Sequence, residues 1–192
     1  LGTVTDPYQP IERKACIMRS CLEMLADYPL LEIDVLTKSD LVMRDLSLLL
    51  RLNKCRVGFT ITTPDDRVAR ILEPGASPPS ARLAALGQLR RAGLPGWVFV
   101  APLLPGIGDA EETLTGLLQE CQNAGAQQVY VDALNPYPSV VRRLWPTYRR
   151  YFPAALKNLD RYLTDRRTYL RGLAGMLRRL SRQYGYDLSL SC

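Results

Sequence analysis

A chain of 192 residues with 47% hydrophobic content can bury a substantial core, as one domain or as one domain with an appendage. Its apolar runs fall short of the roughly 18 to 20 residues that span a bilayer, so we expect a cytoplasmic protein with no membrane contact. The net charge is +6, and the absence of histidine excludes Ser-His-Asp triads, Cys-His dyads and histidine-ligated zinc within this chain.

Five short segments rich in β-branched or aromatic residues are predicted to be buried strands: residues 2–5, 32–37, 56–62, 97–103 and 128–133. Helical patterns lie between them. Pro10 is well placed at the start of the first, in which apolar residues recur at spacings of three and four as far as Leu25. Ser39 can cap the next helix.

Two later helices have clearer ends. One begins after Ser80 and stops at Gly93, a good left-handed terminator. The other begins at Asp109, where Glu112 completes the pattern of a capping box, and ends near Gly125. Strand starts are separated by roughly 24 to 41 residues, so parallel β/α units are the natural assembly and the chain belongs to the α/β class.

Five such units do not easily close a barrel. The chain also opens with Leu1 rather than Met, almost directly inside a predicted strand. We therefore expect at least one preceding β/α unit to be missing from a partial barrel that occupies residues 1–135. The apolar faces left uncovered predict poor solubility or self-association.

Residues 136–192 form a different region. Aromatic residues are crowded between prolines as far as Pro153, and a long amphipathic helix is predicted from about residue 154 to residue 184. Twelve Lys/Arg lie between Arg142 and Arg182 against two aspartates, so that stretch carries about +10 and the rest about −4. A basic end on a mildly acidic body is expected of a protein that meets a polyanion; a solvated basic helix is the alternative.

In parallel β/α architectures the functional site lies at the C-terminal ends of the strands. Polar residues at those ends are expected to converge on one rim: Thr5, Asp6, Thr37, Lys38, Thr60, Thr62, Thr63, Asp132 and Asn135. A Walker A sequence and a Gly-x-Gly-x-x-Gly motif are both absent, so a phosphate loop is unsupported. The cysteines are scattered without a Cys-x-x-Cys pair, which favours reduced thiols and indicates no metal site: Cys16, Cys21, Cys55, Cys121 and Cys192.

Lys38 is the most informative of the rim residues. It follows residues 33–36, which are apolar except for Asp34, and would project from a strand end, either to bind an anionic group or, if desolvated, to act as a nucleophile. A peripheral ion pair with Asp40 is the structural alternative. The threonines could equally satisfy backbone groups, and Asp6 followed by Pro7 is typical of a turn.

Several phrases follow one another in a fixed order along the chain. They are TDPYQPIE at 5–12, LTKS at 36–39, EPGASP at 73–78 with Arg82 and Leu83, AGLP at 92–95 and VFVAPLLPG at 98–106. In this order the set resembles the radical S-adenosylmethionine proteins related to spore photoproduct lyase. The resemblance covers roughly residues 3–109 and is looser from Asp109 onward.

The resemblance implies a partial (β/α)6 barrel whose first β/α unit, with the Cys-x3-Cys-x2-Cys ligands of a 4Fe-4S cluster, precedes this chain. It implies that the cluster and S-adenosylmethionine together generate a 5′-deoxyadenosyl radical. The contacts carried over from the family, with two further strand-end residues, give the predicted cofactor-binding set: Thr5, Lys38, Thr60 and Ala101, with Asp6 and Thr62. No residue of this chain is predicted to bind metal, and no catalytic residue is assigned.

The resemblance has one departure. The lyase carries a cysteine that donates a hydrogen atom where this chain has Thr3, and a hydroxyl cannot donate one as readily as a thiol. Repair of a thymine lesion by the same mechanism is therefore not implied, although DNA repair is the family's setting.

Three hypotheses remain. The first is the S-adenosylmethionine-binding part of a radical enzyme, lyase-like when intact and inactive as this chain alone, which acts on nucleic acid through the basic, aromatic-rich C-terminal region. The second is an aldolase-like barrel in which Lys38 forms a Schiff base. The third is a non-enzymatic module that binds nucleic acid through its Arg-rich helix.

Overall fold

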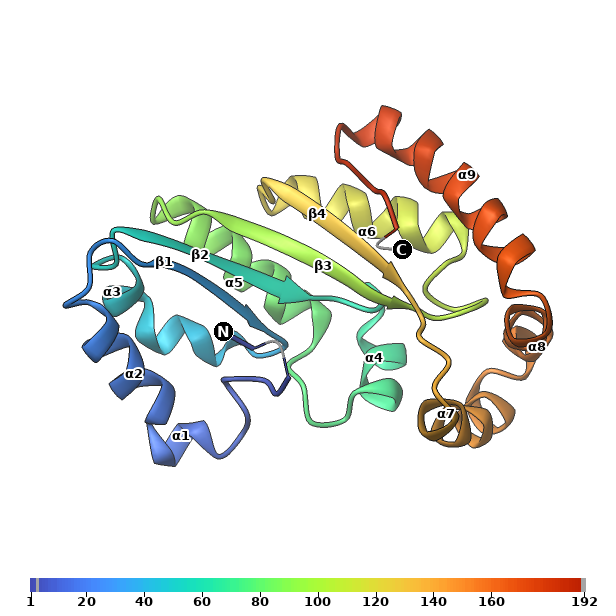
Figure 1. Ribbon diagram of the computed structural model, residues 1–192, viewed down its shortest axis with the longest axis horizontal. Helices are drawn as coiled ribbons and strands as arrows, with labels where there is room; N and C mark the ends of the chain where they lie inside the picture. Colours follow the sequence, from blue (N-terminus) through green and yellow to red (C-terminus); the bar gives the residue numbers. More distant parts are fainter. Residues whose placement is uncertain (3, 191–192) are drawn as a thin grey trace.

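The computed structural model describes residues 1–2 and 4–190, which contain a four-stranded parallel sheet covered by helices (Figure 1). The strands stand side by side in chain order: β1 (Glu32–Thr37), β2 (Lys54–Thr60), β3 (Gly96–Leu103) and β4 (Gln128–Ala133). Every pairing is parallel, as the strand spacing predicts. The α/β class and the last four predicted strands are confirmed, β1 and β4 with the predicted bounds.

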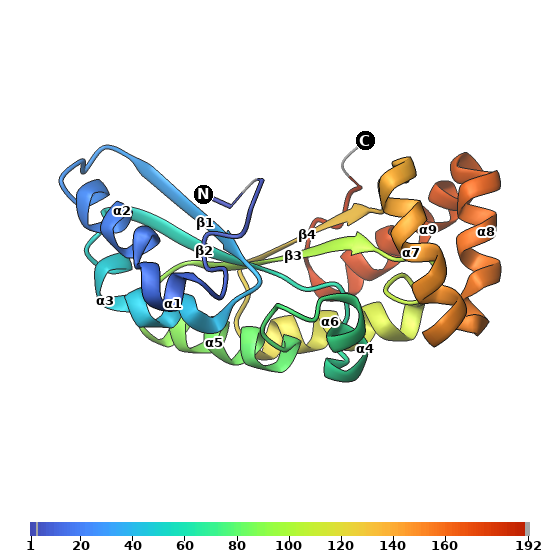
Figure 2. The same ribbon diagram turned by 90° about the horizontal axis from the view of Figure 1, so that it is seen from below.

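Helices occupy the connections between the strands. In chain order they are α1 (Glu12–Ala15), α2 (Ile17–Leu25), the 3-10 helix η1 (Asp40–Asp45), α3 (Leu46–Leu49), α4 (Asp66–Leu72), α5 (Pro79–Arg91), α6 (Glu111–Asn123), α7 (Pro138–Tyr151), the 3-10 helix η2 (Pro153–Ala155), α8 (Leu156–Thr164) and α9 (Arg166–Tyr184). Figure 2 shows α5 and α6 on one face of the sheet and α7, α8 and α9 together at one end. Among the described residues, no helix is both long enough and apolar enough to cross a membrane.

The main core lies between the sheet and its helices. Val57 and Phe59 of β2 and Val98 and Val100 of β3 are fully buried on this side, where period-two alternation directs their side chains toward the helices. Leucines of α5, α6 and α9 complete the same cluster. The apolar face of the C-terminal helix therefore packs as its leucine pattern predicts.

The opposite face of the sheet carries a half-exposed polar and aromatic layer at the N-terminal half of the strands. The Trp97 ring lies across Gly58, where a Cβ atom would come within 2.2 Å of it. The Trp97 Nε1 group donates to Asp34 at 2.9 Å, and Arg56 joins Asp34 to Gln128. This layer forms a floor beneath the strand ends, and only glycine at position 58 leaves room for it.

The strand predicted over residues 2–5 is wrong for the described residues of that segment, and Thr3 lies outside them. Leu1 alone pairs with the outer edge of β1: its amino group donates to the Asp34 carbonyl at 2.5 Å, and its carbonyl accepts from the Leu36 N–H at 2.9 Å. Gly2 then turns the chain away with φ of +97°, a conformation open to glycine.

Two predicted helices in the first half are broken or tightened. The helix predicted over residues 10–25 is split at Cys16, which has a left-handed φ of 52°. The Glu12 carboxylate accepts from the first two N–H groups of α2 at 3.0 Å and so begins a new helix there. Ser39 does cap the next helix, but that helix starts as the 3-10 helix η1 and continues as the short α3.

The helix predicted over residues 154–184 is two helices. Asp165 accepts from the Thr168 N–H at 3.1 Å and begins α9 after α8 has ended. Two further helices are absent from the prediction. They are α4, which Asp65 caps, and α7, which starts at Pro138 in the proline-rich segment.

The ends of α5 and α6 follow the predicted glycines, since Gly93 and Gly125 have φ of +87° and +76°. The predicted capping box at the start of α6 is wrong. Asp109 instead accepts from the Gly106 N–H and from the Tyr169 hydroxyl, both at 2.6 Å, so its carboxylate faces away from the helix.

Candidate functional site

A pocket of about 310 Å³ opens at the C-terminal ends of β1 and β2. Thr5 and Asp6 line it from the segment before α1, Lys38 from the residue after β1, and Thr60 from the last position of β2. The register sets Thr37 opposite Phe59, which brings the two strand ends side by side. Four of the six predicted cofactor-binding residues thus lie around one opening.

Asp6 ties the N-terminal segment to the end of β1. Its Oδ1 atom accepts from the Thr37 hydroxyl at 2.6 Å and from the Tyr8 N–H at 2.8 Å. Its Oδ2 atom accepts from the Lys38 N–H at 2.6 Å. The turn expected at Asp6 is present, and the same carboxylate lines the pocket.

Lys38 is held by a carboxylate that is absent from the predicted site. Its ammonium lies 2.5 Å from Glu73 Oε1, and 35% of its side chain is exposed. The predicted alternative, an ion pair with Asp40, is wrong because Asp40 bonds instead to Ser77. An ammonium has three donors, so the pairing with Glu73 leaves Lys38 capacity for an anion in the pocket.

Glu73 receives three donors at once. Its Oε1 atom accepts from Lys38 and from the Thr62 hydroxyl at 2.7 Å, and its Oε2 atom accepts from Arg82 at 2.9 Å. Burial alone would raise the pKa of Glu73, but the charges of Lys38 and Arg82 and the Thr62 hydrogen bond outweigh it and hold that pKa below its usual value. Glu73 is therefore ionised inside the protein.

Arg82 connects this carboxylate to the second strand. It is fully buried and donates to the Thr60 carbonyl at 2.6 Å and to the Ser77 carbonyl at 2.7 Å as well as to Glu73. Glu73 and Arg82 belong to the phrase EPGASP and its sequel, which is the only sequence signal that could have indicated them.

The other predicted residues lie nearby but outside the pocket lining. Thr62 is buried beneath Lys38 and reaches it through Glu73, and its hydroxyl lies 3.3 Å from the Ala101 carbonyl. Thr63 is buried and bonds to the Asp65 N–H. Asp132 lies near the end of β4 and Asn135 follows that strand, and neither lines this pocket. The single rim expected across all strands is therefore not formed by one pocket.

The cysteines of the described part do not come together. Cys55 and Cys121 are buried, and burial raises the pKa of each thiol to about 12. Cys16 is half-buried and Cys21 exposed, while Cys192 lies outside the described residues. Across residues 1–2 and 4–190, no three Cys, Asp or Glu side chains are grouped so that they could hold a metal ion.

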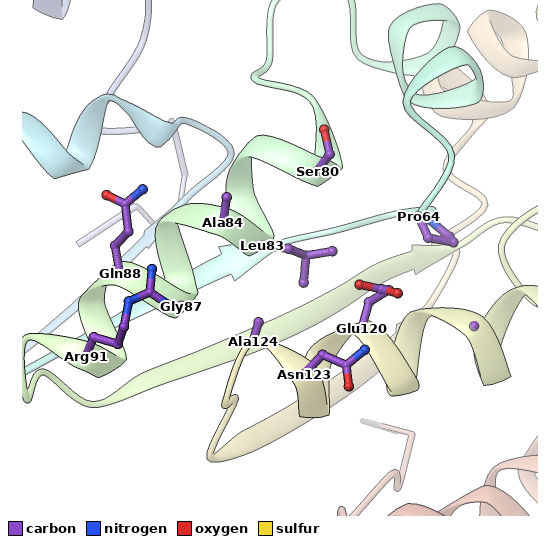
Figure 3. Close-up of a pocket in the computed structure, with 11 residues that line it drawn as sticks. Pro64, Ser80, Leu83, Ala84, Gly87, Gln88, Arg91, Glu120, Asn123 and Ala124 are labelled. Carbon is purple, nitrogen blue, oxygen red and sulfur yellow. The ribbon is translucent and has the colours of Figure 1, made fainter.

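Two larger hollows lie away from the strand ends. One, of about 700 Å³, lies between α5 and α6, where Figure 3 shows Leu83 and Ala84 on one side and Glu120 and Asn123 on the other. The other, of about 610 Å³, lies between α9 and residues 187–190. The second is lined by four exposed arginines of the predicted basic helix: Arg166, Arg167, Arg171 and Arg178.

No family model matches the chain. An uncharacterized protein of Mycobacterium tuberculosis is 34% identical, with 84% of this chain and 53% of that protein covered. An uncharacterized protein of Methanocaldococcus jannaschii is 32% identical over 58% of this chain and 42% of its own length. The chain thus spans about half the length of the curated relatives it matches.

Solved structures identify the fold. Spore photoproduct lyase with dinucleoside spore photoproduct superimposes with a TM-score of 0.67 at 22% identity, over 94% of this chain and 58% of the lyase. Streptococcus suis SuiB bound to S-adenosylmethionine superimposes with a TM-score of 0.54 at 12% identity, over 90% of this chain and 34% of SuiB. The chain therefore shares the fold of the matched parts of these two proteins. The first of these neighbours is spore photoproduct lyase, and the ordered sequence phrases of this chain resemble proteins related to that lyase.

Proposed function

We propose that this chain is the S-adenosylmethionine-binding part of a radical enzyme and that the pocket at the ends of β1 and β2 is its cofactor site. The observation that carries the proposal is the meeting of Thr5, Asp6, Lys38 and Thr60 around one opening. These residues come from three separate segments, yet all four were expected to bind the cofactor. A partial barrel that lacks its first β/α unit is part of the same proposal.

The chemistry of the pocket suits the amino-acid end of this cofactor. Lys38, Glu73 and Arg82 together carry one positive charge in excess, and the Asp6 carboxylate lines the same opening. A zwitterionic head group needs both signs: Lys38 would hold its carboxylate and Asp6 its ammonium. The hydroxyls of Thr5 and Thr60 would form hydrogen bonds with the ribose hydroxyls. A volume of about 310 Å³ is at the lower end of pockets that bind small molecules, roughly 300 to 1,000 Å³.

The described residues do not provide a site for an iron-sulfur cluster. On such a cluster the cofactor supplies a 5′-deoxyadenosyl radical. In this proposal the cluster ligands lie elsewhere in the intact protein, and the present residues bind and orient the cofactor only. No radical step is assigned to them.

The Schiff-base alternative draws no support from the site. A lysine that attacks a carbonyl must lose its proton, and enzymes achieve this by desolvation or by a neighbouring cation. Lys38 is half-exposed, so it is not desolvated, and its side-chain nitrogen is already bonded to the Glu73 carboxylate at 2.5 Å. The surroundings of Lys38 therefore favour anion binding.

Nucleic acid is the proposed substrate class. The hollow beside α9 brings four arginines together, as a surface that meets phosphates would. Tyr137 and Tyr151 expose their rings on α7 and its cap, and the Arg150 guanidinium lies 5.1 Å from the Tyr151 ring centre. Such cation and aromatic pairs are typical of surfaces that bind single-stranded nucleic acid.

The cofactor site is tested by measuring the equilibrium binding of S-adenosylmethionine to this chain with titration calorimetry. Lys38→Met should weaken binding roughly tenfold or more, since it removes a hydrogen bond to a charged group. Lys54→Met is the matched control because Lys54 forms a solvent-exposed ion pair with Glu32 at the other end of the strands. Failure of the wild-type chain to bind, or equal losses in the two variants, would contradict the proposal.

A further inference from the structure

The segment 73–82 does not line the cofactor pocket, although it holds a phrase shared with the related family. Its polar residues form hydrogen bonds to residues that do line the pocket. Glu73 bonds to the Lys38 ammonium, Ser77 N–H donates to the Lys38 carbonyl at 3.0 Å, and Arg82 bonds to the Thr60 carbonyl. The segment therefore contacts both strand ends that carry pocket residues.

Glu73 does not itself line the pocket, and its side chain is only 11% exposed, so it is not placed to contact a ligand there. Arg82 does not line the pocket either: it is fully buried and bonded to three acceptors. Both residues can act on a ligand only through Lys38 and Thr60.

We propose that Glu73 and Arg82 are positioning residues, which fix the Lys38 ammonium and the end of β2 so that the carboxylate of the ligand meets a preformed cation. This inference rests on the proposed function. A lysine on a flexible four-carbon stem loses rotamer freedom when it grips a ligand. The bond to Glu73 removes that freedom beforehand, which is how preorganisation raises affinity.

The role predicts a selective loss of affinity. S-adenosylhomocysteine carries the amino-acid end, while 5′-methylthioadenosine keeps the adenosine and lacks the carboxylate. Glu73→Gln should weaken the first ligand about tenfold, as expected when a charged partner is lost, and leave the second within about twofold. Lys38→Met should give the same selectivity, and the double variant should be no worse than Lys38→Met alone.

The control is Glu32→Gln, which removes the carboxylate of another Lys–Glu pair on β1, at the strand end remote from the pocket. It should change neither affinity. If Glu73→Gln does not fold, Thr62→Val is the second variant, since it removes one bond to Glu73 and leaves the contact with Lys38 in place. Its loss should be smaller, about twofold to threefold, and confined to S-adenosylhomocysteine.

The outcomes separate the two proposals. A wild-type chain that binds neither ligand overturns the proposed function. If the wild type binds both and Lys38→Met is selective, unchanged affinity in Glu73→Gln overturns the positioning role alone. Equal losses for both ligands in Glu73→Gln also overturn it, because general damage to the fold would not distinguish a ligand by its carboxylate.

Discussion

Two buried carboxylates near the strand ends have opposite surroundings. Glu73 is bonded to two cations and a hydroxyl, which hold its pKa below the usual value against the effect of burial. Asp109, which is 8% exposed, is bonded to the Gly106 N–H and the Tyr169 hydroxyl, and burial raises its pKa. Glu73 belongs to a cluster with two cations beside the pocket, whereas the hydrogen-bond donors to Asp109 are a backbone N–H and a hydroxyl.

The difference extends to the regions around them. Near Asp109, hydroxyls of the C-terminal helices bond to loop carbonyls: Tyr148 donates to Pro105 at 3.0 Å, and Tyr162 donates to Leu134. These contacts belong to a second apolar cluster, which joins α7 and α8 to the ends of β3 and β4. Charged side chains therefore lie beside the proposed ligand site, while hydrogen bonds from tyrosine hydroxyls attach the C-terminal helices.

The largest expected effect is at Arg82. Arg82→Met should lower the free energy of unfolding by about 3–5 kcal/mol, because it breaks a buried ion pair and leaves two carbonyls without their donor. Urea denaturation measures the loss. Arg179→Met is the control, since its pair with Glu111 is exposed and should contribute less than about 1 kcal/mol. Similar losses in both variants would remove the distinction between the two kinds of charge.

Tyr148→Phe should have a smaller effect, a loss of about 1–2 kcal/mol, because the Pro105 carbonyl is left buried without a donor. Its affinity for S-adenosylhomocysteine should not change. Tyr151→Phe, at an exposed tyrosine of the same helix, should match the wild type in denaturation. A loss of ligand affinity in Tyr148→Phe would show that the two regions are not separate.

The two carboxylates should give opposite dependences of stability on pH. The contribution of Glu73 is present above the ordinary value of 4.5 and is lost as pH falls through its lowered pKa. Asp109 in the unfolded chain ionises near 3.8 while the folded chain keeps its proton, so stability declines as pH rises from there through the raised pKa.

Unfolding free energies measured from about pH 3 to pH 6 check these signs. Glu73→Gln should remove the loss on the acid side, and Asp109→Asn should remove the decline that accompanies rising pH. If the two substitutions altered the pH profile in the same direction, the contrast between the clusters would be wrong.

The smallest effect on stability is expected at the basic hollow. Replacing Arg167, Arg171 and Arg178 by Ala should change the free energy of unfolding little, within about 0.5 kcal/mol for each exposed site. Arg166 is left in place because it donates to the hydroxyl of buried Tyr162 at 3.0 Å. The same change should weaken binding of a single-stranded oligonucleotide and flatten its salt dependence. The matched control replaces three exposed arginines that lie away from the C-terminal helices: Arg13, Arg51 and Arg67. Equal binding by both variants would contradict a nucleic-acid surface at α9.

Strand positions could be predicted because buried parallel strands are short apolar runs whose pattern is local. The breaks at Cys16 and Asp165 could not, since each depends on a side chain that caps a new helix inside a continuous apolar pattern. The capping box at Asp109 failed for a tertiary reason: Tyr169, 60 positions later, competes for the same carboxylate.

Some residues of the site could likewise be predicted from the sequence and others could not. The rule that polar residues gather at strand ends was enough to bring Lys38 and Thr60 to one pocket. It could not find Glu73, which follows a short helix rather than a strand, nor show that Lys38 pairs with it instead of with the nearer Asp40. Partners 35 positions apart become visible only in the folded chain.

The most direct test of the account is a crystal structure of this chain with S-adenosylhomocysteine. We expect the ligand at the ends of β1 and β2, with its carboxylate on the Lys38 ammonium and Lys38 still bonded to Glu73. Ligand density in the hollow between α5 and α6 or beside α9, with the strand-end pocket empty, would contradict it.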